Sequence, residues 1–242
     1  HPAMAVAEFM RLLVDEYHYS WEKSWEITTK TFAYTNHTIM SEALEKWAVD
    51  LFQPILPRIY SIIEEINRRF CQWVIDMGYE ITLPETAIIY DGMIKMANLS
   101  IVGSHYVNGV SKLHSDILVD STFRAFYSLY TDKFGNVTNG IAHRRWLGQA
   151  NPELTNYLES LIGIDFVKDL SKILKLLDYK DDEKVLHALK NIKHQKKEQL
   201  AAYIQDTLGI TVNPNSIFDV QVKRLHEYKR QLLNALHIVY LY

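Results

Sequence analysis

Basic side chains gather within residues 222–231, whose sequence is VKRLHEYKRQ. The set consists of Lys223, Arg224, His226, Lys229 and Arg230, with Tyr228 among them. Lysine and arginine side chains hold anions through charge-assisted hydrogen bonds, and a phosphate group accepts several such bonds at once. The residue types in this stretch therefore point to the binding of a phosphate.

The cluster is predicted to lie where a strand ends and a helix begins. Apolar and polar side chains alternate from Phe218 to Val222, as in a strand, and an amphipathic helix pattern follows. Helix N-termini attract anions, and open α/β sheets bind ligands at the carboxyl ends of their strands. An exposed basic helix start with ordinary surface salt bridges explains these residues about equally well. We favour a binding site, because helix starts prefer acidic residues and only Glu227 is acidic here.

A second candidate is His105, which lies in the stretch GSHYVNG at a predicted change from strand to helix near Tyr106. A histidine at such a corner can donate a hydrogen bond to a sugar hydroxyl or a carbonyl. Taken alone, this residue is better interpreted as a structural histidine. His114, further along the predicted helix, is interpreted as a helix-face residue without a role.

A third candidate is the stretch from Asn139 to Trp146. Asn139 and Gly140 form a turn signal, and the run Arg144, Arg145 and Trp146 places guanidinium groups beside an aromatic ring. A surface turn followed by a packed tryptophan is the alternative. The sequence has no HExxH, CxxC or paired-histidine pattern, so no metal site is predicted. It also has no GxGxxG motif and no Walker loop, so nucleotide binding through these motifs is not expected.

Helices joined by short buried strands must position these residues, which predicts the α/β class. The predicted helices cover residues 2–17, 20–32, 57–74, 151–163, 166–178 and 181–209. The predicted strands or packed segments cover residues 33–38, 87–92 and 93–104. Trp21, Trp25 and Ile27 are expected in the core, as is the apolar series from Phe52 and Ile55 onward. The loop-rich stretch 120–145 is the best domain boundary.

Composition narrows the class of protein. The chain has 242 residues, of which 48% are hydrophobic and 23% charged, enough for one large or two modest domains. A net charge of −3 gives no reason to expect a nucleic-acid partner, and no apolar run is long enough to span a membrane. A single cysteine excludes a disulfide scaffold and fits a reducing compartment, so a cytoplasmic location is predicted.

Four groups of segments, taken together, resemble the α-glucan phosphorylase family, which includes glycogen and maltodextrin phosphorylases. They are AYTNHT with EALEKW, ANLSIVGSHYVNGVSKLHSDI, DKFGNVTNGI with RRWL, and FDVQVKRLHEYKRQLLN. They run in family order over essentially the whole chain, and the last is a long and specific signature.

This resemblance implies a reaction and an architecture. Such enzymes use inorganic phosphate to cleave the terminal α-1,4-linked glucose of a glucan and release α-glucose 1-phosphate with retained configuration. They have two Rossmann-like domains of the glycosyltransferase-B type and are expected to be homodimers. Pyridoxal phosphate lies between the domains, where its 5′-phosphate relays a proton. Residues 1–140 would be the C-terminal part of the first domain, and residues 141–242 the start of the second, cofactor-binding domain.

The resemblance also implies roles for individual residues. Arg224 and Lys229 would hold the substrate phosphate, and Lys223 would contact the cofactor phosphate. The remaining implied contacts are Tyr228 against the glucose, His105 at its 6-hydroxyl end with Asn139 nearby, Trp146 against the cofactor, and His1 in a loop beside the sugar.

Two departures from the family pattern affect what the chain can do. Ile141–His143 reads IAH where many members have a Thr-Pro pair. No lysine matches the cofactor-bearing motif, which belongs to a later segment, and the glycine-rich phosphate loop belongs to an earlier one. We therefore expect a central fragment of the enzyme, inactive alone. The alternatives are a non-catalytic module with residual phosphate or glucan binding, and a nucleotide-sugar glucosyltransferase of the same fold type.

Overall fold

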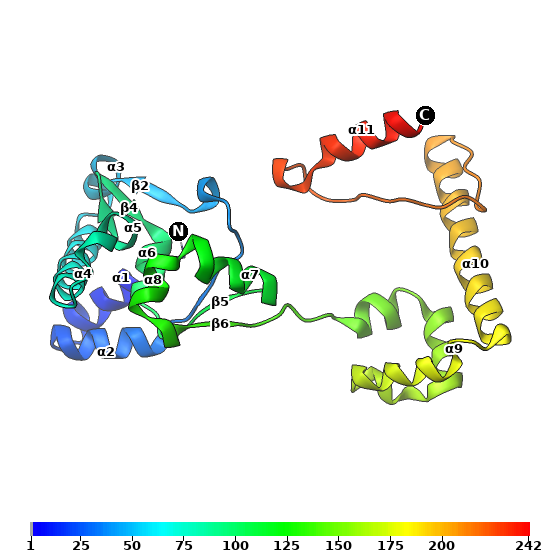
Figure 1. Ribbon diagram of the computed structural model, residues 1–242, viewed down its shortest axis with the longest axis horizontal. Coiled ribbons are helices and arrows are strands. Elements are labelled where there is room, and N and C mark those ends of the chain that lie inside the picture. The colour runs from blue at the N-terminus through cyan, green and yellow to red at the C-terminus, as the bar shows by residue number, and fades with distance from the viewer. Residues whose placement is uncertain (1) are drawn as a thin grey trace. The chain divides into compact units, whose positions relative to one another are not determined.

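The computed structural model describes residues 2–242 and separates into two compact units, His1–Gly140 and Ile141–Tyr242 (Figure 1). The division between Gly140 and Ile141 falls within the loop-rich stretch 120–145. Both contain helices, and the first also contains strands, so the mixed α/β class is confirmed. The assignment of the units to two phosphorylase domains stays a prediction.

The first unit contains two three-stranded sheets. In the parallel sheet, β5 (Val107–Gly109) lies between β1 (Tyr34–Thr35) and β6 (Phe134–Asn136). In the antiparallel sheet, β4 (Met93–Lys95) lies between β2 (Lys46–Ala48) and β3 (Ile89–Tyr90). Asp91 and Gly92, both with positive φ, join β3 to β4, so the turn predicted there is confirmed.

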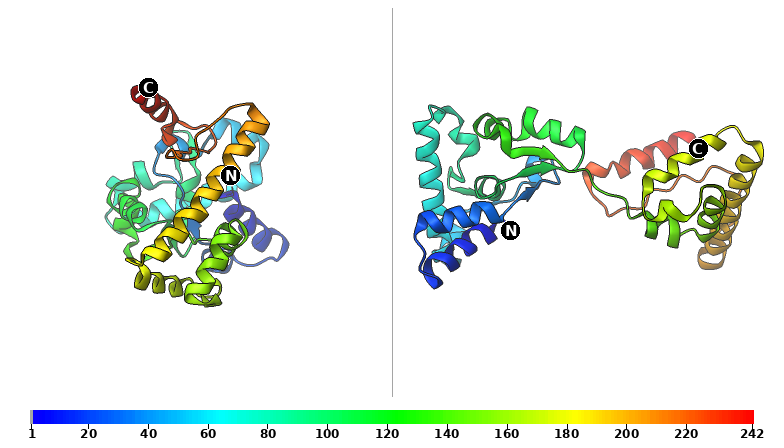
Figure 2. Two further views of the ribbon diagram at one scale, coloured as in Figure 1. Left: turned by 90° about the vertical axis from the view of Figure 1, so that its right-hand side faces the viewer. Right: turned by 90° about the horizontal axis from the view of Figure 1, so that it is seen from below.

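Helices surround these sheets. The α-helices of the first unit are α1 (Met4–Arg11), α2 (Trp21–Thr31), α3 (Val49–Ile55), α4 (Pro57–Asp76), α5 (Leu83–Thr86), α6 (Met96–Val102), α7 (Lys112–Ile117) and α8 (Arg124–Leu129). Figure 2 shows α4 running along one edge of this unit in cyan. Short π-helical segments, Leu12–Glu16 and Leu118–Thr122, continue α1 and α7.

The long helix α4 organises the core, and it begins at Pro57 as predicted. Ile63, Ile66 and Phe70 are buried on one of its faces, together with Met10 from α1. Ile55 was expected on the same face, but 66% of it is exposed. It ends the separate helix α3, so the helical period of α4 does not extend to it.

The core side of α2 also differs from the prediction. Ser24 and Thr28 are its buried residues, whereas Trp21 and Trp25 are only partly buried. Trp21 and Trp25 instead line a cleft. The small side chains of Ser24 and Thr28 let α2 approach α1 closely, so the two tryptophans lie at the margin of this contact.

The stretch from Met93 to Tyr106 was expected to be a strand or packed segment running into a helix. Only Met93–Lys95 is a strand, β4. Helix α6 follows it where a strand or packed segment was expected, and strand β5 follows the predicted corner where a helix was expected. Almost every residue of α6 is buried, so its apolar run has no period that distinguishes a helix from a strand. The amide of Asn98 donates to the carbonyls of Glu85 and Ala87, at 2.7 and 2.9 Å, and anchors α6.

The second unit is helical. Its α-helices are α9 (Pro152–Ile162), α10 (Glu183–Leu208) and α11 (Gln231–Leu241). Asn151 caps α9, and Gly209, with a φ of 71°, ends α10, as predicted. The helix predicted over 166–178 is instead two 3-10 segments, Ile164–Val167 and Leu170–Tyr179, which pack with Leu158 and Ile162.

The strand predicted from Phe218 to Val222 does not form. The segment before α11 has no regular structure, and Val220 and Val222 are 65% and 85% exposed. A strand needs a neighbour to receive its backbone hydrogen bonds, and none of the described residues from 141 onward forms one. No helix over the described residues 2–242 has the length and apolar character needed to cross a bilayer.

Candidate functional site

The predicted phosphate-binding residues lie in one exposed loop, residues 223–230, which we call the basic loop. It is extended up to His226, makes a single 3-10 turn over Glu227–Lys229, and leads into α11. The nitrogen Nδ1 of His226 accepts a hydrogen bond from the amide of Tyr228, at 3.4 Å. The cations therefore precede a helix, as predicted, but they do not follow a strand.

Gln231, which the sequence analysis did not single out, holds the two arms of the basic loop together. Its Nε2 donates to the carbonyls of Lys223 and Arg224, each at 3.2 Å. Its Oε1 accepts from the amide of His226, at 3.1 Å. A polar residue at the first position of an apolar helix is the signal that could have identified it.

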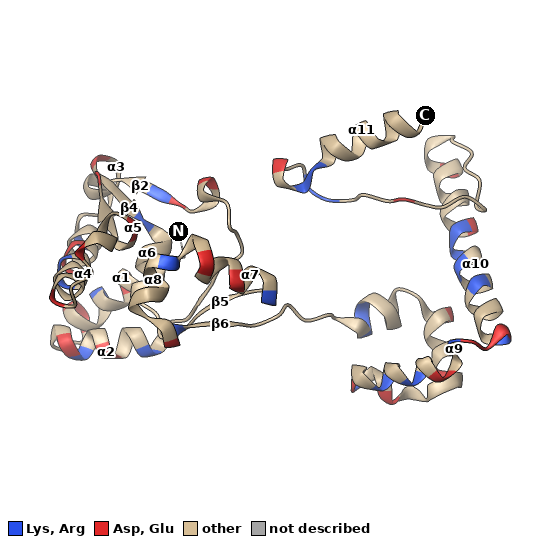
Figure 3. Cartoon of the chain, in the orientation of Figure 1, with Lys and Arg blue, Asp and Glu red and all other residues tan. Residues whose placement is uncertain are grey.

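The cations of the basic loop outnumber its single acidic residue, Glu227. Among residues 2–242, Lys223, Arg224, Lys229 and Arg230 form no ion pair. Figure 3 shows basic residues on the loop leading into α11. Several unpaired cations on one short loop suit an anion with more than one charge, such as a phosphate.

Tyr228 lies beside two of these basic side chains. Its ring centroid is 4.2 Å from that of His226, and Nζ of Lys229 lies 5.6 Å from the centre of the tyrosine ring. The tyrosine is 56% exposed, so one side of the ring is available to a ligand. A sugar or another flat group can contact this face.

Trp146 belongs to a π-helical segment, Arg144–Gln149, in the same unit. The guanidinium carbon of Arg145 lies 5.0 Å from the centre of the indole, as the sequence predicts. Trp146 is 68% exposed, so it is not a packed tryptophan. No hydrogen bond or ion pair over the described residues 141–242 joins it to the basic loop.

In the first unit, His105 and Asn139 lie at opposite ends of the parallel sheet. His105 precedes β5, is exposed, and donates its backbone amide to the carbonyl of Phe32 at 3.0 Å. Asn139 follows β6, which runs parallel to β5, and donates its amide to the carbonyl of Val110 at 3.1 Å. The whole length of the strands therefore separates them. His1, the remaining predicted sugar contact, lies outside the described residues.

His114 has a structural role that the sequence analysis missed. Its Nδ1 accepts from the amide of Val110 at 3.1 Å, and its Nε2 lies 3.0 Å from Oδ1 of Asn36. Because Nδ1 accepts, Nε2 must carry the proton and donate to Asn36. Burial lowers the pKa of His114, which favours this neutral form. The partners are far apart in sequence, so no local pattern indicates the pair.

Other polar side chains gather at the same carboxyl ends of the parallel strands. Thr35 donates to Asn108 at 3.0 Å, and Ser115 donates to Asn136 at 2.9 Å. Asn36 and Asn108 are 1% and 6% exposed. This edge is where ligands bind in open α/β sheets, and its side chains are neutral hydrogen-bonding groups that suit hydroxyl-rich molecules.

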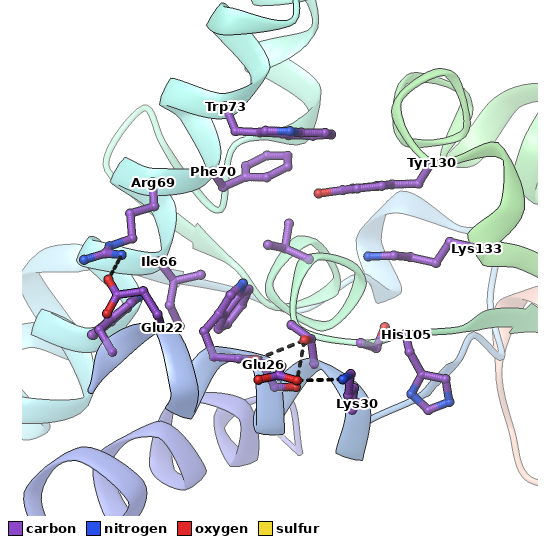
Figure 4. Close-up of a pocket in the computed structure, with 15 residues that line it drawn as sticks. Glu22, Glu26, Lys30, Ile66, Arg69, Phe70, Trp73, His105, Tyr130 and Lys133 are labelled. Atoms are coloured by element: carbon purple, nitrogen blue, oxygen red, sulfur yellow. Dashed lines mark hydrogen bonds and ion pairs between the residues drawn. The ribbon is translucent and has the colours of Figure 1, made fainter. Parts of the chain in front are cut away.

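A cleft of about 700 Å³ lies on the other side of this unit (Figure 4). Its lining combines aromatic residues of α2 and α4 with His105, Tyr130 and Lys133. Among the described residues, His105 is the one predicted site residue that lines this cleft. Figure 4 shows its ring at the edge of the cleft, directed away from Lys133.

Two features bear on the class of protein: an α/β unit with polar side chains at its parallel strand ends, and a helical unit with a basic loop whose cations form no ion pair within the described residues. Neutral polar side chains can hydrogen-bond hydroxyl groups, and unpaired cations can bind phosphate. The whole chain, residues 1–242, matches the family described as carbohydrate phosphorylase. The chain belongs to the carbohydrate phosphorylase family.

Individual relatives agree with this family. All of the chain aligns with the glycogen phosphorylase of Bacillus subtilis (strain 168), at 54% identity over 244 residues. All of it also aligns with the muscle form of glycogen phosphorylase from sheep (Ovis aries) and from human, each at 47% identity over 247 residues. The chain spans 31% of the bacterial relative and 29% of each muscle relative.

Proposed function

We propose that these 242 residues are the central part of an α-glucan phosphorylase, which works in the cytoplasm as a homodimer. The reaction is the reversible phosphorolysis of the terminal α-1,4-linked glucose of glycogen or maltodextrin to give α-glucose 1-phosphate. The observation that carries this proposal is the family match along the whole chain, with the unpaired basic loop at the position of the family signature. The 31% share of the bacterial relative supports the view that further segments complete the enzyme.

Within this proposal, the two units belong to two Rossmann-like domains of the glycosyltransferase-B type. His1–Gly140 is the C-terminal part of the first domain, and Ile141–Tyr242 begins the cofactor-binding domain. Asn139 contacts the glucose from the first domain, and Tyr228 contacts it from the second. His105 was expected beside Asn139, but it lies at the opposite end of the parallel strands and is not assigned to this contact. His1 is assigned to the loop beside the sugar.

The basic loop fits the phosphate groups of the reaction. Cleavage of the glycosidic bond builds positive charge on the sugar and requires a proton on the leaving oxygen. Substrate and cofactor phosphates repel each other when they meet, so cations must offset both charges. Arg224 and Lys229 hold the substrate phosphate, and Lys223 holds the cofactor phosphate.

Two residues fit pyridoxal phosphate by their chemistry, although they belong to separate segments of this unit, Arg144–Gln149 and the basic loop. Lys223 offers an unpaired ammonium group to its phosphate, and Trp146 offers an exposed ring face to its apolar part. When bound, this cofactor supplies a phosphate that exchanges a proton with the substrate phosphate. No lysine of this sequence matches the motif that carries the cofactor, so the chain alone should not turn over.

A chimera tests the proposed function. This chain would replace the aligned segment of the Bacillus subtilis glycogen phosphorylase, and α-glucose 1-phosphate formation from maltoheptaose and phosphate would be measured. We expect an active chimera, and a loss of about 100-fold or more for its R224A variant, since a lost charge contact at the reacting group has that effect. A chimera that loads the cofactor but forms no product contradicts the proposal, and turnover of UDP-glucose instead supports the glucosyltransferase alternative.

The unpaired cations also favour a second, weaker function for the chain alone, the binding of phosphate without turnover. Calorimetric titration with inorganic phosphate would measure it, and R224A would weaken it. Formation of α-glucose 1-phosphate by the chain with added cofactor would overturn the expected inactivity.

A further inference from the structure

Lys133 stands out among the charged side chains that line the cleft of the first unit. Glu22 pairs with Arg69 at 3.0 Å, and Glu26 pairs with Lys30 at 2.7 Å. Among residues 2–242, Lys133 forms no ion pair. The other charges of the cleft are therefore already matched, and this ammonium group is not.

The position of the ammonium group is well defined. Its Nζ donates to the carbonyl of Ile101 at 3.0 Å and lies 3.9 Å from the centre of the Tyr130 ring. An ammonium group has three donors, so one carbonyl leaves two of them for a ligand. Figure 4 shows the amine of Lys133 directed into the cleft. Burial lowers the pKa of Lys133 to about 8, so the isolated charge is costly and an anion would offset that cost.

An aromatic column leads away from this charge. Tyr130 stacks on Trp73 with their ring centroids 5.0 Å apart and their planes 8° from parallel. Trp73 in turn lies 5.9 Å from Phe70. Trp25 and Ile66 add to the apolar lining. A volume of about 700 Å³ is typical of small-molecule sites, and a mostly apolar lining with one placed charge is their usual composition.

We propose that this cleft binds a small aromatic carboxylate, whose carboxylate pairs with Nζ of Lys133 and whose ring lies against the apolar lining. A neutral aromatic molecule would leave the ammonium unpaired. An inorganic phosphate would leave the aromatic surface uncovered and would meet one unpaired cation here, against four on the basic loop. The proposal does not depend on the phosphorylase reaction, because none of the residues assigned to phosphate lies in this unit.

Ligand titrations test the site without any variant. The probe is 1-naphthoate, and its neutral counterpart is 1-naphthalenemethanol, which has the same ring system; calorimetry measures both. At about pH 7 we expect the carboxylate to bind at least about tenfold more tightly than the alcohol, as a charge-assisted hydrogen bond provides. This preference should disappear at about pH 9.5, which is above the pKa of about 8 to which burial lowers Lys133. Equal binding of the two probes at about pH 7, or no saturable binding of 1-naphthoate, would overturn the proposal.

The other groups facing the cleft must be considered in the pH series. They are Glu22, Glu26 and Lys30 on α2, Arg69 on α4, and His105 and Tyr130. Burial raises the pKa of Tyr130, so this phenol stays neutral throughout the series. The two acids and the lysine of α2 are in ion pairs, and Arg69 keeps its charge over this range.

Two lysine variants test whether Lys133 causes the preference for the carboxylate. Lys133→Met should lose the preference for the carboxylate, whereas Lys30→Met, which removes a paired lysine from the rim, should change it less than about threefold. Unchanged carboxylate preference in K133M would refute the assignment to Lys133. Circular dichroism verifies that each variant is folded, and if K133M is not, Lys133→Arg, which retains the charge, must keep the preference for the proposal to stand.

Discussion

The Nε2 of His114 lies 3.0 Å from Oδ1 of Asn36, across two segments that are 78 positions apart in sequence. The same oxygen accepts from the amide of Thr38 at 2.9 Å. One buried amide therefore joins α7 to the segment that follows β1. Because the histidine donates through one ring nitrogen and accepts through the other, only its neutral form satisfies both contacts.

Acid should weaken the first unit through His114. Its pKa is lowered in the folded state, mainly by burial, so the unfolded chain binds more protons and stability falls as the pH falls. The contribution is complete above about pH 6.5, the ordinary histidine value, and is lost as the pH drops through the lowered pKa. His114→Gln should flatten the dependence of the melting temperature on pH between about 5 and 7. His37→Gln is the control, since His37 adds a repulsion but no hydrogen bond to this ring.

Removing the side chain of Gln231 should loosen the basic loop. Gln231→Leu eliminates two donated hydrogen bonds and one accepted bond that tie the loop arms together. We expect cleavage by trypsin at Lys223 and Arg224 to become about tenfold faster, because hydrogen bonds of this kind contribute roughly 1 kcal/mol each. Gln199→Leu, an exposed glutamine on α10, should leave the rate unchanged. Equal rates in both variants would show that the hydrogen bonds do not order the loop.

Two isoleucines that look equivalent in sequence should differ in their contribution to stability. Ile63→Ala, at a position with 0% exposure, should reduce the free energy of unfolding of the first unit by about 2–5 kcal/mol. Ile55→Ala, at a position with 66% exposure, should change it by less than about 0.5 kcal/mol. Urea denaturation followed by circular dichroism measures both. A large loss for the second variant would place Ile55 in the core after all.

The last helix should promote self-association. Leu232, Leu236, Val239 and Tyr240 are 75%, 58%, 73% and 85% exposed, so α11 presents apolar surface to water. Exposed apolar patches drive non-native association. Leu232→Glu combined with Leu236→Glu should shift the sedimentation-velocity distribution toward monomer at high concentration. The same change at two exposed leucines of α10, Leu200 and Leu208, is the matched control and should shift it much less.

Long helices with end signals could be predicted from the sequence. Pro57 begins α4, Asn151 caps α9 and Gly209 ends α10, each because a local chemical preference acts within one helical turn. Short, fully buried elements could not be predicted in this way. The apolar run of α6 fits a helix or a strand, and its contacts with the rest of the core decide between them.

The candidate sites also include features that the sequence predicts and features that only the fold reveals. By itself, the sequence determined that several basic residues share one stretch and that this stretch belongs to a family signature, because both properties lie within the consecutive residues 218–234. Only the tertiary structure decided that Gln231 orders this loop, that His114 binds Asn36, and that Lys133 faces an aromatic cleft without an ion partner. Each of the last two depends on segments distant in the chain, and hydrogen bonding and burial act between neighbours in space. Such contacts can be identified only in the folded structure, where the distant segments are neighbours.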